Sequence, residues 1–209
     1  MKISILILTH KRPELFKRCI NSVLKNKPDN VEILVNNDSN DIEEIPGATY
    51  YYKQDNNLSN IYNFLMETAQ GEYLYFLEDD DYVVLNFWNI LLNDIKTNKT
   101  LFYNYIPHDG MLEYFNRFNG IIKNNYYNKE DFLQIVQEEH FQISQMCFRK
   151  NDINEYMKGN FLDNDWKLFI GINNDIYYNS IPIFIQTIDG KDNISFEKYN
   201  TDVRFKGQH

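Results

Sequence analysis

Four consecutive acidic residues, Glu78 to Asp81, directly follow the apolar segment 73–77. Placing four carboxylates together costs free energy through like-charge repulsion, which a bound cation would relieve. Carboxylate oxygens suit hard ions such as Mg²⁺ or Mn²⁺, which bind one or two protein carboxylates together with substrate phosphates. A solvated acidic turn is the alternative. The position of the run at the end of an apolar strand favours a metal site that could hold a diphosphate and act as a Lewis acid.

A second polar run, residues 36–41, follows the aliphatic segment 31–35. It contains Asn37 and Asp38, whose side chains have hydrogen-bonding groups that a nucleotide could use. Asn and Asp are also ordinary turn residues. Both interpretations remain open for this run.

The first 80 residues alternate between apolar strands and amphipathic helices. Pro13 suits the first turn of a helix, and Gly71 is expected to end the second helix as its C-cap. Strand-helix-strand units with right-handed crossovers build a parallel sheet, in which ligands bind beyond the carboxyl ends of the strands. Both polar runs should therefore lie at the same rim of the sheet, which the carboxyl ends of the parallel strands form. The expected strands are residues 3–8, 31–35, 48–53 and 73–77, and the expected helices are residues 13–24 and 61–69.

The second half of the chain is less regular. Residues 100–128 are rich in Tyr, Asn and Phe and have no clear periodicity. No repeat or low-complexity linker divides the chain, so we expect one domain. The expected helices are residues 84–96, 129–139 and 165–172, and the expected strands are residues 143–149, 176–178 and 183–187.

The composition disfavours several classes of protein. The 21 basic and 30 acidic residues give a formal charge of −9, which disfavours a broad nucleic-acid footprint. Neither Cys19 nor Cys147 lies in a metal or redox motif, so both are expected to be buried free thiols in a reducing compartment. No apolar run is long enough for a membrane span. We therefore expect a cytoplasmic protein, with peripheral association with a membrane left open.

Five segments in this order resemble the family-two glycosyltransferases with the GT-A fold. The resemblance is good over residues 1–90 and looser over residues 143–195. It implies an α/β fold with a mostly parallel, Rossmann-like central sheet flanked by helices. The segments are ILILTHKRPELFKRCINSVLKN, VEILVNNDSND, NNLSNIYNFLMETAQGEYLYFLEDDD, QMCFRK and FLDNDWKLF.

The resemblance implies a role for each of eleven residues. Asp165 falls where the family has its catalytic base, although it could simply cap a helix that begins at Trp166. Asp80 is the best candidate metal ligand, and Asp79 is expected near the donor ribose. The implied metal ligands are Glu78, Asp80, Asp81 and Asp189, for Mn²⁺ or Mg²⁺. The implied nucleotide-sugar ligands are Thr9, Arg12, Asn37, Asp38, Asn57 and Asp79.

Three positions depart from the family pattern. Asn37 replaces the Asp that often reads a uracil base, and its amide can still pair with uracil. Glu78 stands where the family usually has Asp. Asp189 stands where many relatives carry a His near the metal, and an Asp could also bind the ion.

The resemblance implies transfer of a hexose from a nucleotide-diphosphate donor, with a UDP-sugar expected, to an acceptor hydroxyl. Inversion is expected, with Asp165 as general base. The acceptor is expected to be a carbohydrate, a glycolipid or another hydroxyl compound; the charge disfavours a nucleic-acid acceptor, which stays open as an alternative. Residues 1–97 would form the nucleotide-sugar half and residues 98–209 the acceptor half of one GT-A domain. A nucleotidyltransferase-like enzyme and a non-catalytic nucleotide-sugar-binding protein of this fold are the alternatives.

Overall fold

The computed structural model describes residues 1–97, 99–107, 124–128, 130–132, 134, 142–153 and 174–187. Its helices are α1 (Pro13–Leu24), α2 (Leu58–Thr68) and α3 (Phe87–Asp94), with the 3-10 turns η1 (Ile143–Gln145) and η2 (Lys150–Asp152). Its strands are β1 (Ile3–Thr9), β2 (Val31–Asn37), β3 (Thr49–Tyr51), β4 (Tyr73–Glu78), β5 (Tyr82–Val83), β6 (Thr100–Pro107), β7 (Asn125–Tyr127), β8 (Met146–Arg149) and β9 (Ile176–Gln186).

The strands form one nine-stranded sheet, in which β3, β2, β1 and β4 lie side by side and run parallel. Strand β8 pairs with β4 in the antiparallel direction, and the order continues through β6 and β9 to β5, with β7 also on β9. Strands β6 and β9 are parallel, whereas β5 and β7 are antiparallel to β9. The expected α/β sheet is confirmed, with an all-parallel part in the first half of the chain and a mixed part in the second.

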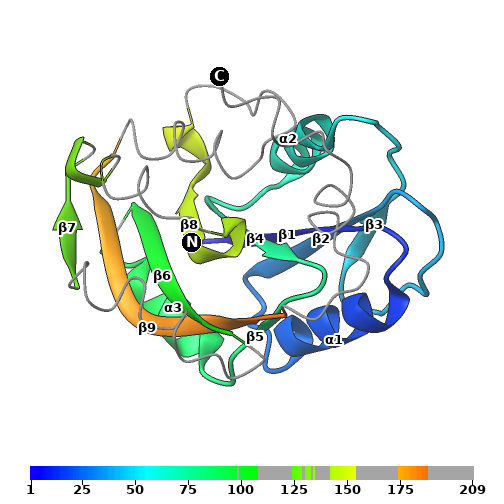
Figure 1. The fold of residues 1–209 in the computed structure, drawn as a ribbon, viewed down its shortest axis with the longest axis horizontal. Helices are drawn as coiled ribbons and strands as arrows, with labels where there is room; N and C mark the ends of the chain where they lie inside the picture. Colours follow the sequence, from blue (N-terminus) through cyan, green and yellow to red (C-terminus); the bar gives the residue numbers. More distant parts are fainter. Residues whose placement is uncertain are drawn as a thin grey trace, which may run out of the picture.

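Helix α2 covers one face of the sheet, and α3 covers the other (Figure 1). Successive residues of a strand point to opposite faces. On β4, the ring of Phe76 therefore packs against Tyr62 of α2, whereas the ring of Tyr75 packs against Phe87 of α3. The sheet is thus a middle layer between helices.

Helix α1 lies on the same face as α3. Its Phe16 contacts Tyr50 of β3, whereas the next strand residue, Tyr51, contacts Phe64 of α2 on the opposite face. The helix begins with Pro13 at its first position, as predicted. The apolar stripe that it buries against the sheet consists of Phe16, Cys19, Ile20 and Val23.

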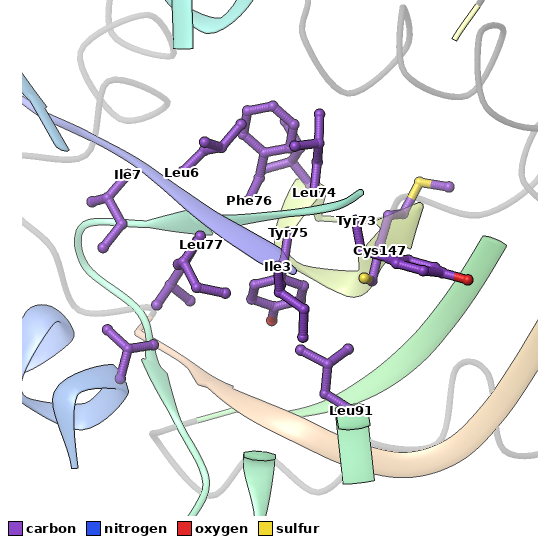
Figure 2. Close-up of a cluster of buried hydrophobic side chains, with 14 of the residues drawn as sticks. Ile3, Leu6, Ile7, Tyr73, Leu74, Tyr75, Phe76, Leu77, Leu91 and Cys147 are labelled. Atoms are coloured by element: carbon purple, nitrogen blue, oxygen red, sulfur yellow. The ribbon is translucent and has the colours of Figure 1, made fainter. Parts of the chain in front are cut away.

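The centre of the core surrounds β1 and β4, where both faces of the strands are covered (Figure 2). This double burial explains the continuous apolar runs that the sequence shows for these strands. It also gives the residues at the strand ends a rigid base. Leu6, Leu74 and Phe76 lie on one side of the two strands, and Tyr75, Leu77 and Leu91 lie on the other.

The prediction that Gly71 is a helix C-cap is wrong. Helix α2 is capped at its end by Ala69, and Gly71 does not adopt a positive φ. The reason for a glycine is instead a close approach to β1. A Cβ atom at this position would lie 2.5 Å from the backbone nitrogen of Ser4 and 2.8 Å from the carbonyl carbon of Ile3.

Replacing Gly71 with alanine is expected to destabilise the protein by about 1–3 kcal/mol, because the backbone of β1 would have to move to admit the methyl group. Urea unfolding measures this change. The matched control is Gln70→Ala at the exposed neighbouring position, which should change stability by no more than about 0.5 kcal/mol. Equal stability of the two variants would contradict this account of Gly71.

The second half of the chain differs from the predictions in five places. Helix α3 is shorter than the expected helix 84–96, and the expected strand 143–149 begins with the turn η1. Strands β6 and β7 were not predicted, and the two short strands expected within 176–187 form the single strand β9. Strand β9 continues through Pro182 because the register with β6 is irregular there, and a proline is tolerated at such an irregularity.

The expected helix 129–139 is confirmed at the residues that the structure describes. Residues 130–132 and 134 are helical, whereas the rest of the expected helix 129–139 lies outside the described residues, as does the expected helix 165–172. Cys19 and Cys147 are free and buried, as predicted. None of the helices in the described part of the chain has the length and apolar character that a membrane crossing needs.

Candidate active site

The strand register confirms that the polar runs meet at one rim of the sheet. Thr9, the last residue of β1, is paired with Asn37 on β2, and Leu8 is paired with Glu78 on β4. The strand order reverses at β1, because β2 and β3 lie on one side of it and β4 lies on the other. In open α/β sheets ligands bind at such a point, beyond the carboxyl ends of the strands. The residues that follow β1, β2 and β4 therefore surround the candidate site.

A tight turn folds the acidic run, because the N–H of Asp81 donates to the main-chain oxygen of Glu78 at 3.1 Å. The turn brings Glu78, Asp80 and Asp81 together, so that one carboxylate oxygen of each lies within 4.8 Å of the other two. Oxygen Oδ2 of Asp81 is buried and has no hydrogen-bond partner in the described part of the chain. Three converging carboxylates, one with an unpartnered buried oxygen, fit a hard divalent cation.

Burial makes the charged forms of these acids costly. Asp79, Asp80 and Asp81 are each at most 6% exposed. Burial raises the pKa of Asp79 to about 6, although the nearby charge of Arg12 lowers it. Burial also raises the pKa of Asp80. Burial first, and then the negative charge of Asp80, raise the pKa of Asp81 well above its usual value. A cation at this turn would offset both the desolvation and the repulsion.

Asp79 is not part of the converging group, and its carboxylate contacts the loop after β1. Its Oδ1 lies 3.1 Å from Nη1 of Arg12, and its Oδ2 accepts from the N–H of His10 at 3.4 Å. The same Nη1 atom of Arg12 donates to Oδ2 of Asp80 at 3.0 Å. Arg12, which the resemblance placed near the nucleotide, is thus directly attached to the acidic turn.

Two residues that sequence reasoning missed hold the acidic turn in place. Arg18 of α1 donates to the main-chain oxygen of Asp80 at 2.6 Å and also to the hydroxyl of Thr187. The N–H of Thr187 in turn donates to Oδ1 of Asp81 at 3.1 Å. The guanidinium of Arg18 lies 4.6 Å from the ring centre of Tyr82, in a cation–π contact. The only signal in the sequence was a basic residue beside the apolar stripe of α1.

The two asparagines at the end of β2 have different surroundings. Asn36 exchanges hydrogen bonds with the main chain of Lys53, at 2.9 and 3.0 Å, so its amide holds the loop after β3. Asn37 is buried, and its Oδ1 accepts from the hydroxyl of Ser39 at 3.2 Å. Its Nδ2 has no partner in the described part of the chain. The amide of Asn37 therefore has a free donor at the rim.

Asp38 and Thr9 join the loops after β2 and β1. Oδ1 of Asp38 lies 2.6 Å from Nδ1 of His10, and the N–H of Asp38 donates to the main-chain oxygen of Thr9 at 3.3 Å. Both residues were predicted to lie near the nucleotide, and both are located at the rim beside the acidic turn. His10 connects Asp38 to the acidic turn, because its ring contacts Asp38 and its N–H donates to Asp79.

One predicted residue, Asn57, lies away from this cluster, and two others lie outside the described part of the chain. Asn57 caps helix α2, where its side-chain oxygen accepts from the N–H of Ser59 at 3.0 Å. Asp165 and Asp189 lie outside the described residues. The functional roles of all three therefore stay predictions.

The sequence matches the family described as Glycosyl transferase family 2 over residues 4–157 of 209. The chain therefore belongs to this family, as the resemblance of its motifs predicted. A comparison with curated proteins gave no match.

The fold is the GT-A fold expected from that resemblance. Residues 1–349 of TarS from S. aureus superpose with a TM-score of 0.64 at 17% identity, over 90% of this chain and 60% of that chain. The same TarS fragment in complex with UDP-GlcNAc gives a TM-score of 0.65 at 16% identity, over 90% and 58% of the two chains. Its complex with UDP gives 0.64 at 16% identity, over 90% and 61%. The chain thus spans about three-fifths of the TarS fragment, and the likeness shows the fold alone.

Proposed function

We propose that this chain transfers a hexose from a nucleotide-diphosphate donor to an acceptor hydroxyl, and that the donor is a UDP-sugar. One observation carries the proposal: Glu78, Asp80 and Asp81 converge beyond the end of β4, where the strand order of a family-two fold reverses. The fold is shared with TarS, whose structures were solved in complex with UDP-GlcNAc and with UDP.

The converging carboxylates would hold Mn²⁺ or Mg²⁺, with Asp189 as a further ligand. When bound, such an ion supplies charge neutralisation to a departing diphosphate. Glu78, Asp80 and Asp81 would orient the donor from the end of β4. The burial of Asp80 and Asp81 supports this role, since few waters compete for their oxygens.

The nucleoside would lie on the rim formed by the loops after β1 and β2. The free amide N–H of Asn37 suits a carbonyl oxygen of a uracil base, and Asp79 is close enough to the same rim to bind the ribose. Thr9 and Asp38 complete this wall through the hydrogen bond that joins their main chains. Asn57 would contribute from the start of α2.

Asp165 would act as general base. Its carboxylate accepts the proton of the acceptor hydroxyl, whose oxygen attacks the anomeric carbon from the side opposite the departing diphosphate. Attack from that side inverts the anomeric configuration. In this proposal, residues 1–97 bind the donor, and residues 98–209 supply the base and bind a carbohydrate, glycolipid or other hydroxyl acceptor. The cytoplasmic localisation expected from the sequence stays a prediction.

Incubation of the protein with a panel of nucleotide-sugars and Mn²⁺ tests the proposal. We expect release of a nucleoside diphosphate, which should stop when the ion is chelated and return when Mn²⁺ is restored. Product analysis separates the alternatives: nucleoside diphosphate and free or transferred sugar support the proposal, whereas pyrophosphate indicates a nucleotidyltransferase. Undiminished turnover after chelation would contradict the metal-dependent form of the proposal.

A further inference from the structure

The acidic turn already contains one cation, the guanidinium of Arg12. Its Nη1 lies 3.1 Å from Oδ1 of Asp79 and 3.0 Å from Oδ2 of Asp80, so one nitrogen bridges two carboxylates. All three side chains are at most 9% exposed. Charges with so little water around them are screened weakly, and each acts strongly on the next.

Asp80 belongs to two groups at once. Its carboxylate accepts a hydrogen bond from Arg12, and it also converges with those of Glu78 and Asp81. A divalent cation bound by the converging acids would therefore share Asp80 with the guanidinium. Arginine does not lose its proton in proteins, so Arg12 cannot relieve the repulsion by becoming neutral. It therefore keeps its charge beside the ion, and contact with another anion would offset the repulsion.

A donor diphosphate would supply that other anion. Arg12 immediately precedes Pro13, the first residue of α1, in the loop after β1. The loop therefore borders the rim of the sheet at the point where the strand order reverses. A planar guanidinium pairs well with phosphate oxygens, and the amino end of a helix also favours an anion.

We propose that Arg12 is a positioning residue that couples the binding of metal and nucleotide. It neutralises Asp79 and Asp80 while no ion is bound, and it weakens the binding of a divalent cation alone. It transfers its contact to the diphosphate when ion and nucleotide bind together. The inference rests on the proposed function, because it takes the ion and the diphosphate as the ligands of the acidic turn and the loop after β1.

Coupling of this kind has a measurable form. If UDP tightens the binding of Mn²⁺ by some factor, Mn²⁺ must tighten the binding of UDP by the same factor. For the unchanged protein we expect a factor of at least about 10, within the usual range for coupled sites. In Arg12→Met, Mn²⁺ alone should bind about tenfold more tightly, and the factor should fall to within about twofold of unity.

The experiment titrates the full chain with Mn²⁺, with and without UDP, and follows free Mn²⁺ by electron paramagnetic resonance. Titration of UDP in the calorimeter, with and without Mn²⁺, gives the reciprocal factor. Lys17→Met is the matched control, because it removes the same charge from an exposed position of α1 and should leave the coupling unchanged. Arg12→Lys keeps the charge and should retain most of the coupling.

A gain in Mn²⁺ affinity in Arg12→Met supports the inference, since a merely misfolded site would lose affinity. An unchanged coupling factor in Arg12→Met, with both ligands still bound, overturns the inference alone. A loss of coupling in Lys17→Met as well would overturn it too, because the effect would then be one of net charge. If the unchanged protein binds neither Mn²⁺ nor UDP, the proposed function fails and the inference fails with it.

Discussion

Replacing Asp81 with asparagine should abolish the response of the protein to Mn²⁺ and make the metal-free protein more stable. Oδ1 of Asp81 accepts from the N–H of Thr187, and an asparagine oxygen can keep that bond. The buried Oδ2 has no partner in the described part of the chain. The substitution therefore removes a buried negative charge close to two other carboxylates and leaves the supporting hydrogen bond intact.

The substitution should weaken Mn²⁺ binding but stabilise the metal-free protein. The negative charge of Asp81 would attract the ion, whereas the same buried charge destabilises the folded protein when no ion is bound. Loss of one electrostatic contact to a developing charge typically costs about 10²–10³-fold in turnover, and we expect this loss for donor hydrolysis. A gain of about 1–3 kcal/mol is expected in the free energy of unfolding without metal, since an uncompensated buried charge is lost. In the unchanged protein Mn²⁺ should raise the melting temperature, as any ligand of the folded state does.

Thermal unfolding with chelator and with Mn²⁺ measures both effects. Asp29→Asn is the matched control, because Asp29 is exposed and precedes β2 at the opposite edge of the sheet. It removes the same charge and should leave the Mn²⁺ response unchanged. An Asp81→Asn protein that Mn²⁺ still stabilises to the same extent would remove Asp81 from the metal site.

The pH dependence of the free energy of unfolding provides a second test of the burial of these carboxylates. Because the pKa of Asp79 is raised to about 6, the folded protein binds more protons than the unfolded chain between about pH 4 and 6. The metal-free protein should therefore lose stability as the pH rises through this window. Asp81 adds to this loss, since its pKa is also raised, so the slope should be smaller in Asp81→Asn.

The first half of the fold could be predicted because three of its strands, β1, β2 and β4, are buried on both faces. Such strands appear in the sequence as continuous apolar runs, and each run ends where the chain reaches the rim. The Tyr73–Glu78 strand shows this directly, since its last residue is the first acid of the run. Parallel connections then put the polar ends of neighbouring strands together, which explains why the rim was also predicted.

Strand β6 was missed because its polar groups are satisfied by residues distant in the sequence. The hydroxyl of Tyr103 donates to Asp94 at 3.1 Å, and its main-chain oxygen accepts from the side chain of Gln145 at 2.8 Å. A local pattern contains no information about these partners, so the segment resembles an irregular polar stretch. Gly71 was misinterpreted for a similar reason, because the crowding that requires a glycine comes from Ser4 and Ile3 of β1, almost 70 residues earlier in the chain.

The sequence predicted which residues form the candidate site but not the hydrogen bonds and ion pairs that connect them. Motif order identified the acids and the loop after β1, yet the ion pairs of Arg12 with Asp79 and Asp80 link positions almost 70 residues apart. The hydrogen bond between Arg18 and Thr187, which supports the turn, links positions 169 residues apart. The residue types therefore indicated a site for a cation. Only the fold shows that the guanidinium of Arg12 already contacts two carboxylates of the acidic turn.

Replacing Asp165 with asparagine should lower sugar transfer by about 10²–10⁴-fold while UDP binds with unchanged affinity. A general base contributes to the transition state and not to donor binding, so the loss should appear in kcat. An asparagine keeps the size of the side chain and can still cap a helix that begins at Trp166. Loss of a cap therefore cannot explain a large effect of this substitution.

The pH profile and a neighbouring substitution make the assignment of Asp165 specific. If its carboxylate accepts the proton, the rising acid limb of the profile of kcat/KM should disappear in Asp165→Asn. Asp163→Asn, in the same FLDNDWKLF segment, is the control and should keep both the rate and the limb. Full turnover in Asp165→Asn together with loss in Asp163→Asn would transfer the role of base to Asp163. Loss of UDP binding in Asp165→Asn would instead indicate a structural role, because a base that acts only on the acceptor has no contact with the nucleotide.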